Sequence, residues 1–213
     1  MIRPDAVLKI GGSLSRRPAA LRRLMAALGA AAERHVLAVV PGGGPFADAV
    51  RRADRRLRLD DSASHWMAIL AMDQYAYVLA SLAPRARLVR EPAAVARGRL
   101  NVLQVADWLR DADALPHSWA VTSDSIAAWI ARRLRAKMLV LVKDVDGQFD
   151  RDPARGGTRL RARIARRRVR GVVDAYLPRA LGPRLPCWIV NGLHPGRAVT
   201  LVETGAAYGT RVV

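Results

Sequence analysis

The sequence predicts an α/β protein, folded as a three-layer α/β/α sandwich with a central, mostly parallel sheet of about eight strands. Short runs rich in β-branched residues alternate along the chain with longer stretches of helical periodicity, which is typical of parallel sheets covered by helices on both faces. In addition, two glycine-rich loops each follow directly after such a run, where α/β proteins bind anionic groups.

Length and composition favour a single domain spanning residues 1–213, because 51% of the residues are hydrophobic and a chain of this length can bury a substantial core. No apolar run approaches the roughly 18 residues of a membrane span, and the first residues lack the pattern of a signal peptide. We therefore expect a cytoplasmic protein with no membrane partner. The single cysteine, Cys187, lies in an apolar run and is expected to be buried without a catalytic role.

Strands are expected at residues 6–10, 35–40, 86–89, 99–103, 119–122, 138–142, 188–190 and 210–213, which are short and rich in apolar and β-branched side chains. Helices are expected at residues 18–33, 45–56, 61–82, 123–134, 172–181 and 195–202, where apolar residues recur with the period of a helix face. Residues 144–158 follow neither pattern and are expected to form a long loop that could act as a lid.

The first expected strand ends in a loop with anion-binding chemistry, within the sequence LKIGGSL. Gly11 and Gly12 let backbone amides approach an anion closely, and Ser13 can donate another hydrogen bond or cap the next helix. Lys9 can reach the same anion. An isolated Gly-Gly-Ser also occurs as an ordinary tight turn between a strand and a helix.

The second expected strand leads into a similar loop, within VVPGGGPFAD. Gly42, Gly43 and Gly44 follow the strand, and Pro45 stands at the first position of the next helix. Two such loops in one small chain predict that both a donor and an acceptor with anionic groups are held.

The longest helical pattern covers residues 61–82. Apolar residues on its faces, among them Met72, favour a core helix or a helix that contacts another subunit. Alternatively, its polar and aromatic side chains could offer carboxylates to a cationic substrate and aromatic faces to a ring. These side chains are Asp60, Asp61, His65, Trp66, Asp73 and Tyr75.

The helix expected at residues 123–134 begins in the sequence VTSDSIAAWIA. Ser123 or Asp124 could be its N-cap. Alternatively, Asp124 could orient the lysines at the neighbouring strand ends.

The strand expected at residues 138–142 leads into Lys143 and an acidic loop, LVLVKDVDGQFDRDP. The loop lacks the further glycine and the terminal glutamate of a calcium-binding loop. A nucleotide-binding loop fits its composition better.

The net charge of +18 raises nucleic acid as a partner, since residues 155–170 alone hold eight arginines. No aromatic residue is interleaved with them and the other basic residues are scattered, so nucleic acid is not the expected partner. Only three of the 36 basic residues are lysines, Lys9, Lys137 and Lys143, and two of these stand at ends of expected strands. A lysine supplies a compact, mobile point charge, which suits phosphate chemistry.

Taken in order, the four motifs above and the C-terminal WIVNGLHPGRAVTLVETGAAYGTRV resemble the amino acid kinase family, from Lys9 to Val213. The resemblance implies an ATP-dependent kinase that binds ATP toward its C-terminal half and a small acceptor toward its N-terminal half. It also implies Mg²⁺ held largely by the ATP phosphates, with no protein ligand. A homodimer or higher homo-oligomer is expected.

The resemblance also implies roles for individual residues. The implied catalytic residues are Lys9, Asp124 and Lys143. The implied ATP-binding residues are Gly11, Gly12, Ser13, Lys143, Asp144, Asp146, Gly147, Phe149 and Asp150. The implied acceptor-binding residues are Gly42, Gly43, Gly44, Arg51, His65 and Asn191.

One departure from the family pattern bears on the acceptor. Some members carry a second catalytic lysine after the nucleotide loop, whereas RRRVRGVVDAYLPRAL contains none, and Arg168 or Arg170 could take its place. This favours members that phosphorylate a phosphate monoester. The short chain, the triglycine loop and the aromatic and acidic residues of 59–82 resemble the small kinases of methanofuran biosynthesis, which convert 5-(aminomethyl)-3-furanmethanol phosphate into its diphosphate.

Other functions on the same fold stay open. The acceptor could be a nucleoside monophosphate, an isoprenoid phosphate or a carboxylate. The chain could also be a non-catalytic protein that binds a nucleotide or an oxyanion.

Overall fold

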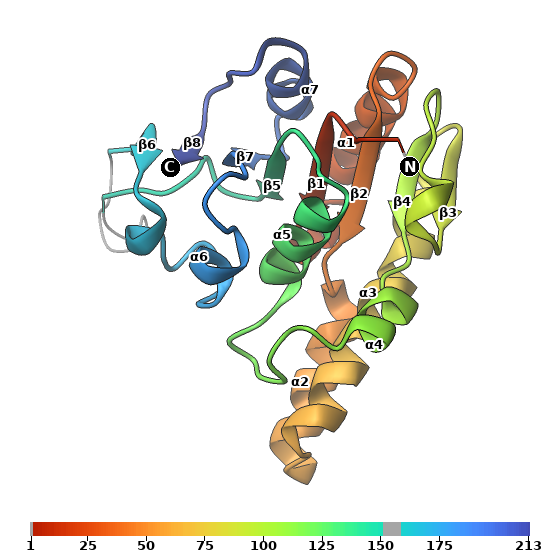
Figure 1. Cartoon of the computed structure of the whole chain (residues 1–213), viewed down its shortest axis with the longest axis vertical. Coiled ribbons are helices and arrows are strands. Elements are labelled where there is room, and N and C mark those ends of the chain that lie inside the picture. Colours follow the sequence, from red (N-terminus) through yellow and green to blue (C-terminus); the bar gives the residue numbers. More distant parts are fainter. Residues whose placement is uncertain (1, 151–158) are drawn as a thin grey trace.

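The computed structural model describes residues 2–150 and 159–213, and its centre is one sheet with the strand order β3-β4-β2-β1-β5-β7-β8-β6 (Figure 1). The strands are β1 Ala6–Ile10, β2 Leu37–Pro41, β3 Ala86–Val89, β4 Leu100–Leu103, β5 Leu139–Lys143, β6 Arg163–Ile164, β7 Cys187–Asn191 and β8 Thr210–Val212. Neighbouring strands are parallel except for β7 and β8. The predicted α/β class with a mostly parallel sheet is confirmed.

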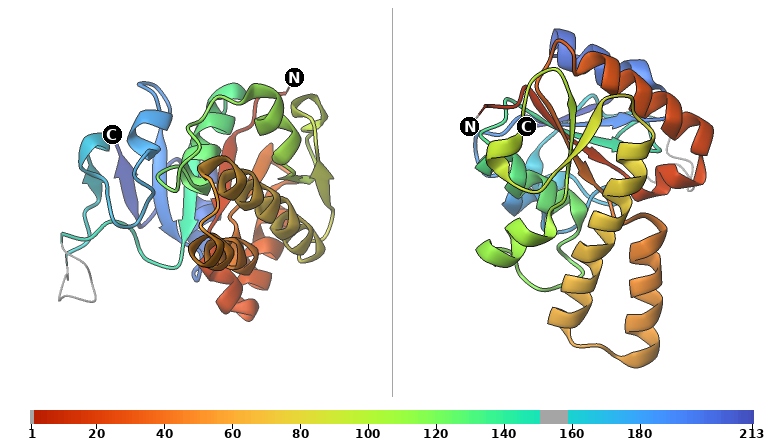
Figure 2. Two further views of the ribbon diagram at one scale, coloured as in Figure 1. Left: turned by 90° about the horizontal axis from the view of Figure 1, so that it is seen from below. Right: turned by 90° about the vertical axis from the view of Figure 1, so that its right-hand side faces the viewer.

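Helices cover both faces of this sheet (Figure 2). They are α1 Pro18–Ala31, α2 Gly44–Leu57, α3 Asp61–Ser81, α4 Ala106–Ala112, α5 Ser123–Arg133, α6 Leu177–Ala180 and α7 Pro195–Thr204, with short 3-10 helices η1 Gly12–Arg16, η2 Pro92–Ala94 and η4 Arg166–Arg168. Helices α2 and α3 run antiparallel and project beyond the sheet (Figure 2). Within the described residues, no helix is long and apolar enough to cross a membrane.

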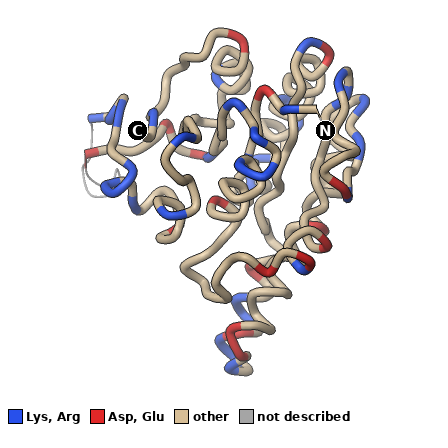
Figure 3. Tube along the Cα trace, in the orientation of Figure 1, with Lys and Arg blue, Asp and Glu red and all other residues tan. Residues whose placement is uncertain are grey.

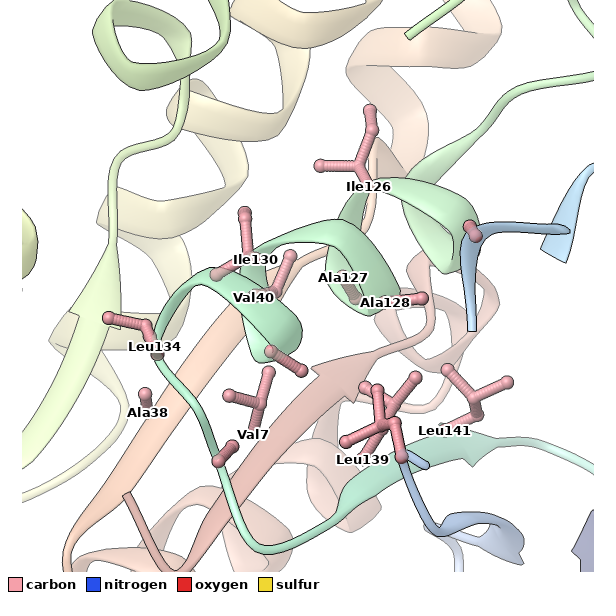
Figure 4. Close-up of a cluster of buried hydrophobic side chains, with 14 of the residues drawn as sticks. Val7, Ala38, Val40, Ile126, Ala127, Ala128, Ile130, Leu134, Leu139 and Leu141 are labelled. Atoms are coloured by element: carbon pink, nitrogen blue, oxygen red, sulfur yellow. The ribbon is translucent and has the colours of Figure 1, made fainter. Parts of the chain in front are cut away.

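The alternation of side chains along β1 gives each face its own core. Val7 points to the face covered by α5, where it packs with residues such as Ile130 and Leu141 (Figure 4). Leu8 points to the opposite face, which α1 and α7 cover. Because side chains alternate along a strand, Lys9 shares the α5 face with Val7. This places the one charged residue of β1 beneath the first turn of α5.

Two predicted elements are wrong, and in both places side chains satisfy the backbone. Residues 119–122, predicted as a strand, form a turn, because Trp119 is held by α2 and the Thr122 amide donates to the Asp174 carboxylate. Of the helix predicted at residues 172–181, only α6 is helical, because Asp174 accepts from the Leu177 amide and so starts the helix there.

One observed strand and one observed α-helix were not predicted. Strand β6 has only two residues, and α4 begins where the Asp73 carboxylate accepts from the amides of Val105 and Ala106. The loop predicted at residues 144–158 is described only as far as Asp150, and the first part of the arginine-rich segment also lies outside the described residues. Cys187 is buried, as predicted.

Candidate active site

Two lysines from neighbouring strands bind a single aspartate at the carboxyl edge of the sheet. Lys9 Nζ lies 2.9 Å from Asp124 Oδ1, and Lys143 Nζ lies 2.6 Å from Asp124 Oδ2. Lys9 and Asp124 are buried, and Lys143 is partly buried. The N-cap of α5 is Thr122, so Asp124 does not cap the helix but orients the two lysines. Of the two alternatives open from the sequence, this geometry matches the second.

Burial and mutual attraction set the protonation of this group. Burial lowers the pKa of Lys9 to about 8, the attraction of Asp124 opposes that shift, and the like charge of Lys143 adds to it. Burial alone would raise the pKa of Asp124, but the two ammonium groups hold it well below its usual range. Two lysine side chains thus share one carboxylate, an arrangement that favours binding of an anion.

The two glycine-rich loops lie against each other beside this group. A Cβ atom on Gly12 would lie 2.4 Å from the Gly44 nitrogen, and one on Gly42 would lie 2.8 Å from the Gly12 nitrogen. Glycine is therefore required here by the close approach of two backbones. Gly44 also has a φ of +56°, which a residue with a side chain rarely adopts.

Some of the loop amides are available to an anion and others are not. The amides of Gly11 and Gly42 donate to Val142 and Ile10 within the sheet edge. Within the described residues, the amides of four loop residues have no hydrogen-bond acceptor, namely Gly12, Ser13, Gly43 and Gly44. They stand at the starts of η1 and α2, so both helix N-termini offer free donors in one place.

A cavity of about 710 Å³ opens on one side of the lysine pair. It is lined by Ser13, Lys143, Asp144, Val145, Gln148, Phe149, Asp150, Arg161, Ile164, Arg168, Arg170, Gly171 and Val172, and we call it the donor pocket. Five of the residues predicted to bind ATP are among them. The lining combines four basic side chains with an apolar end.

Three further predicted residues have other surroundings. Asp146 accepts from Asn191 Nδ2 at 2.9 Å and from Arg197, so it joins the loop after β5 to the end of β7 and to α7. Asn191, predicted to bind the acceptor, is thus engaged by the loop after β5. Gly147 has a φ of +148°, and a Cβ atom there would lie 2.4 Å from Thr210 Oγ1, which makes it a tight structural position.

A smaller cavity, of about 40 Å³, lies between α2, α3 and the start of α5. It is lined by Gly43, Ala47, Arg51, Ser64, His65, Ala68, Ile69, Met72, Ser118, Trp119, Val121, Thr122, Ser123 and Ile126, and we call it the acceptor pocket. It brings together Gly43, Arg51 and His65, three of the residues predicted to bind the acceptor.

Trp119, which the sequence did not indicate as a site residue, closes this pocket. Its indole Nε1 donates to Asp54 Oδ2 at 2.7 Å, and the Arg51 guanidinium lies 4.9 Å from its ring centroid. His65 stacks on His117 at 4.4 Å, from the same loop as Trp119. Both contacts fasten that loop to the α2 and α3 helices.

The acidic residues of the α3 segment do not face the acceptor pocket. Asp60 caps α3 by accepting from the Ala63 amide, and Asp73 accepts from two amides at the start of α4. Tyr75 packs against Gly44, and burial raises the pKa of its hydroxyl. For these residues the structural interpretation of the helix is correct.

Asp174 is a further residue that the sequence did not single out. Its carboxylate accepts from Thr122 and Ser125 at the start of α5, and its own amide donates to Asp124 Oδ2 at 3.3 Å. The only sequence signal was its place three residues before Leu177 at the start of α6, which is typical of a helix cap.

The profile of the amino acid kinase family matches residues 6–171, well over half of the chain. The chain belongs to the amino acid kinase family. The kinase is 30% identical over 216 aligned positions to [5-(aminomethyl)furan-3-yl]methyl phosphate kinase of Methanocaldococcus jannaschii, an alignment that covers 97% of each chain. The predicted family and the predicted phosphotransferase activity on a small molecule are confirmed.

Solved structures show the same fold. The uridylate kinase of Archaeoglobus fulgidus superposes with a TM-score of 0.76 at 20% identity, covering 98% of this kinase and 100% of that chain. The isopentenyl phosphate kinase of T. acidophilum superposes with a TM-score of 0.67 at 19% identity, covering 98% and 99%.

The pKa of Lys9 leads to a testable pH dependence. We expect kcat to fall as the pH rises through about 8, because the Lys9 ammonium then loses the proton that neutralises transferring phosphate. Stability should change in the opposite direction. Between about 8 and the ordinary lysine value of 10.5 the unfolded chain binds the extra proton, so the free energy of unfolding rises with pH. Initial rates and thermal melts over this range measure both.

Lys137→Met provides the control, because Lys137 pairs with Asp5 at the opposite end of β1. In this variant kcat should fall over the same pH range as in the wild type, which we call the descending limb of the kcat profile. A kcat that stays flat up to pH 10.5 would contradict the role of the Lys9 ammonium.

Proposed function

We propose that the kinase transfers the γ-phosphoryl group of ATP to the phosphate of a small phosphate monoester, with 5-(aminomethyl)-3-furanmethanol phosphate as the first candidate acceptor. The observation that carries the proposal is the lysine pair on Asp124, with Lys143 lining the donor pocket and a second pocket at the start of the helix that carries Asp124. The similarity to the phosphate kinase of Methanocaldococcus jannaschii supports this acceptor. Both pockets would work within one domain, in the cytoplasm, where ATP is available.

The donor pocket fits a nucleotide triphosphate. Its volume lies in the range of small-molecule sites. Lys143 and the arginines at 161, 168 and 170 can bind phosphates, and Phe149 and Ile164 offer an apolar surface to a base. Within the described residues, no group of three or more His, Cys, Asp or Glu side chains could hold a metal. Mg²⁺ would be held mainly by the nucleotide phosphates, where it neutralises part of their charge.

The residues between the pockets supply charge neutralisation and little covalent chemistry. A phosphate monoester is largely dianionic near neutral pH, so its oxygen can attack without a general base. The new bond forms between this oxygen and the γ-phosphorus, while the bond to the bridging oxygen of ADP breaks. Lys9, Lys143 and the free amides of the two glycine loops would stabilise the negative charge that spreads over the transferring group.

Lys143 would also take the place of the second lysine that some family members carry. It lines the donor pocket together with Arg168 and Arg170, but it also binds the same carboxylate as Lys9. We therefore assign Lys143 to the transferring phosphoryl group and the two arginines to the nucleotide.

The lining of the acceptor pocket favours a flat, largely apolar substrate body beside a phosphate. Arg51 and the amide of Gly43 can bind the phosphate, and Ile69 and Met72 offer apolar contacts. Among its described lining residues there is no carboxylate to pair with an aminomethyl group. This observation supports an isoprenoid phosphate as the second candidate acceptor.

A coupled ADP-release assay with Mg²⁺ tests the proposal. The panel comprises the aminomethyl furan phosphate, the same compound without its amino group, isopentenyl phosphate, UMP and N-acetylglutamate. We expect the aminomethyl furan phosphate to give the highest kcat/KM. A preference for isopentenyl phosphate would support the second candidate, and ADP release with N-acetylglutamate alone would overturn both.

Trp119 should determine how well the acceptor binds. The pocket has room for only one or two water molecules, so the acceptor must displace the side chains that close it. We expect Trp119→Leu to raise the KM for the acceptor about tenfold, roughly the loss of one aromatic contact, with little change in the KM for ATP.

Trp188→Leu is the matched control for this variant, because Trp188 is another indole covered by an arginine but lies on β7, away from the pocket. It should leave the KM for the acceptor unchanged. A rise in the KM for ATP instead of the acceptor would contradict the assignment of the two pockets.

The exposed face of α3 is proposed to pair with a second copy of the chain. Exposed residues recur at positions 67, 70, 74, 77 and 81, and these are Met, Leu, Gln, Tyr and Ser. Met67, Leu70 and Tyr77 are 38%, 45% and 54% exposed. An uncharged stripe of this length is unusual on a chain with a net charge of +18, whose basic residues are spread over the whole fold (Figure 3). Pairing with the same stripe of a second copy would bring no charges together.

We expect Leu70→Glu to convert a dimer into a monomer of 23.3 kDa in light scattering after size exclusion. Leu57→Glu is the control, because Leu57 is 66% exposed but lies at the end of α2 outside the stripe. A wild-type protein that is already monomeric, or a dimer that survives the Leu70 change, would contradict this interface.

A further inference from the structure

We propose that Asp174 is a positioning residue for phosphoryl transfer, which clamps the first turn of α5 and so holds Asp124 between Lys9 and Lys143. The inference rests on the proposed function and extends it to a residue outside both glycine loops and the lysine pair. Three observations on Asp174 support the inference. Its carboxylate accepts hydrogen bonds at the start of α5, its backbone amide donates to the Asp124 carboxylate, and its charge acts on Lys9.

The first contact is the clamp on α5. Oδ2 of Asp174 accepts from the Thr122 amide at 3.0 Å, from Thr122 Oγ1 at 2.9 Å and from the Ser125 amide at 2.9 Å. Oδ1 accepts from Ser125 Oγ and from the Leu177 amide at 2.9 Å. Thr122 has no capping side-chain bond of its own, so a residue 49 to 52 positions along the chain supplies the cap of this helix.

The second contact reaches Asp124 directly. Asp124 stands between the two clamped residues, and the backbone amide of Asp174 donates to its Oδ2 at 3.3 Å. The same oxygen receives the ammonium group of Lys143. Asp174 therefore fixes the backbone that carries Asp124 and also one oxygen of its carboxylate.

The third contact is electrostatic. The negative charge of Asp174 raises the pKa of Lys9 and so opposes the effect of burial. Asp174 also follows Gly171 and Val172, which line the donor pocket. It thus ties the wall of that pocket to the lysine pair.

The clamp is not what keeps α5 folded. Below its first turn the helix buries Ile126, Ala127, Ile130 and Ala131 against the sheet. These contacts persist when Asp174 changes, so its loss is expected to shift the first turn without unfolding the helix. A small displacement of a catalytic group is enough to cost a large part of the rate.

Asp174→Asn tests the proposal. Asparagine has nearly the same size as aspartate but carries no charge. Its side-chain NH₂ group would replace one carboxylate oxygen and face backbone amides and hydroxyls that are themselves donors. We expect kcat to fall roughly 10- to 100-fold, with the KM values for ATP and the acceptor changed less than threefold. The descending limb of the kcat profile should move to lower pH. Asp174→Glu should keep the limb near its wild-type position, because it keeps the charge, but should not restore kcat.

Asp5→Asn is the matched control, since Asp5 is another partly buried carboxylate that accepts from an amide and a lysine, at the far end of β1. It should leave kcat and the limb unchanged. If Asp174→Asn does not fold, Thr122→Val and Ser125→Ala each remove one hydrogen bond of the clamp. Each should then lower kcat about two- to fivefold, the effect of one lost hydrogen bond. The proposal would be overturned if Thr122→Val and Ser125→Ala both kept the wild-type kcat. It would also be overturned if Asp174→Asn kept the wild-type dependence of kcat on pH.

A readout without turnover separates this inference from the proposed function. The chain has only three lysines, so ¹³C-labelled lysine gives three side-chain signals in an NMR titration. In Asp174→Asn the Lys9 signal should titrate at lower pH, while that of Lys137 stays in place. If the wild-type enzyme is inactive with every acceptor but Asp174→Asn shifts the Lys9 titration, only the proposed function is overturned. If the wild-type enzyme is active but Asp174→Asn leaves the Lys9 titration in place, the role of Asp174 is overturned.

Discussion

The shared carboxylate of Asp124 is the constraint on which the rest of the active site depends. A buried charge without a partner costs several kcal/mol, so Lys9, Lys143 and Asp124 can be buried only together. Adjacent parallel strands supply the two lysines, and the helix above them supplies the carboxylate. The sheet register therefore fixes the cationic centre before any substrate binds, which is the form of electrostatic stabilisation that costs no reorganisation during the reaction.

The two lysines bound to Asp124 differ from the other basic residues of the protein in how firmly they are held. The many arginines lie over the whole fold and draw anions from solution (Figure 3). They are long side chains, and most of them are exposed. The two lysines at the sheet edge are held by short contacts to one carboxylate, and in the proposed mechanism they, and not the surface field, would select the transferring phosphoryl group.

The sequence was informative where function depends on strand ends and uninformative where it depends on contacts between distant side chains. Lys9, Lys143 and both glycine loops could be found because each directly follows an apolar run, and the topology of a parallel sheet brings such ends together. Trp119 was taken for part of a strand, because its apolar neighbours have that pattern and its bond to Asp54 spans 65 residues. Asp174 and β6 were missed for related reasons, since one acts through a distant helix and the other has only two residues.

The contact between Gly12 and Gly44 has a consequence for how acceptor preference can change during evolution. In the proposed mechanism this backbone contact would separate the two substrates, so the distance over which the phosphoryl group travels would not depend on any rotamer. The side chains that line the proposed acceptor pocket come from α2, α3 and the loop that carries Trp119. On this proposal, new acceptors would arise by exchanging those side chains while the glycine contact, and with it the path of transfer, stays the same.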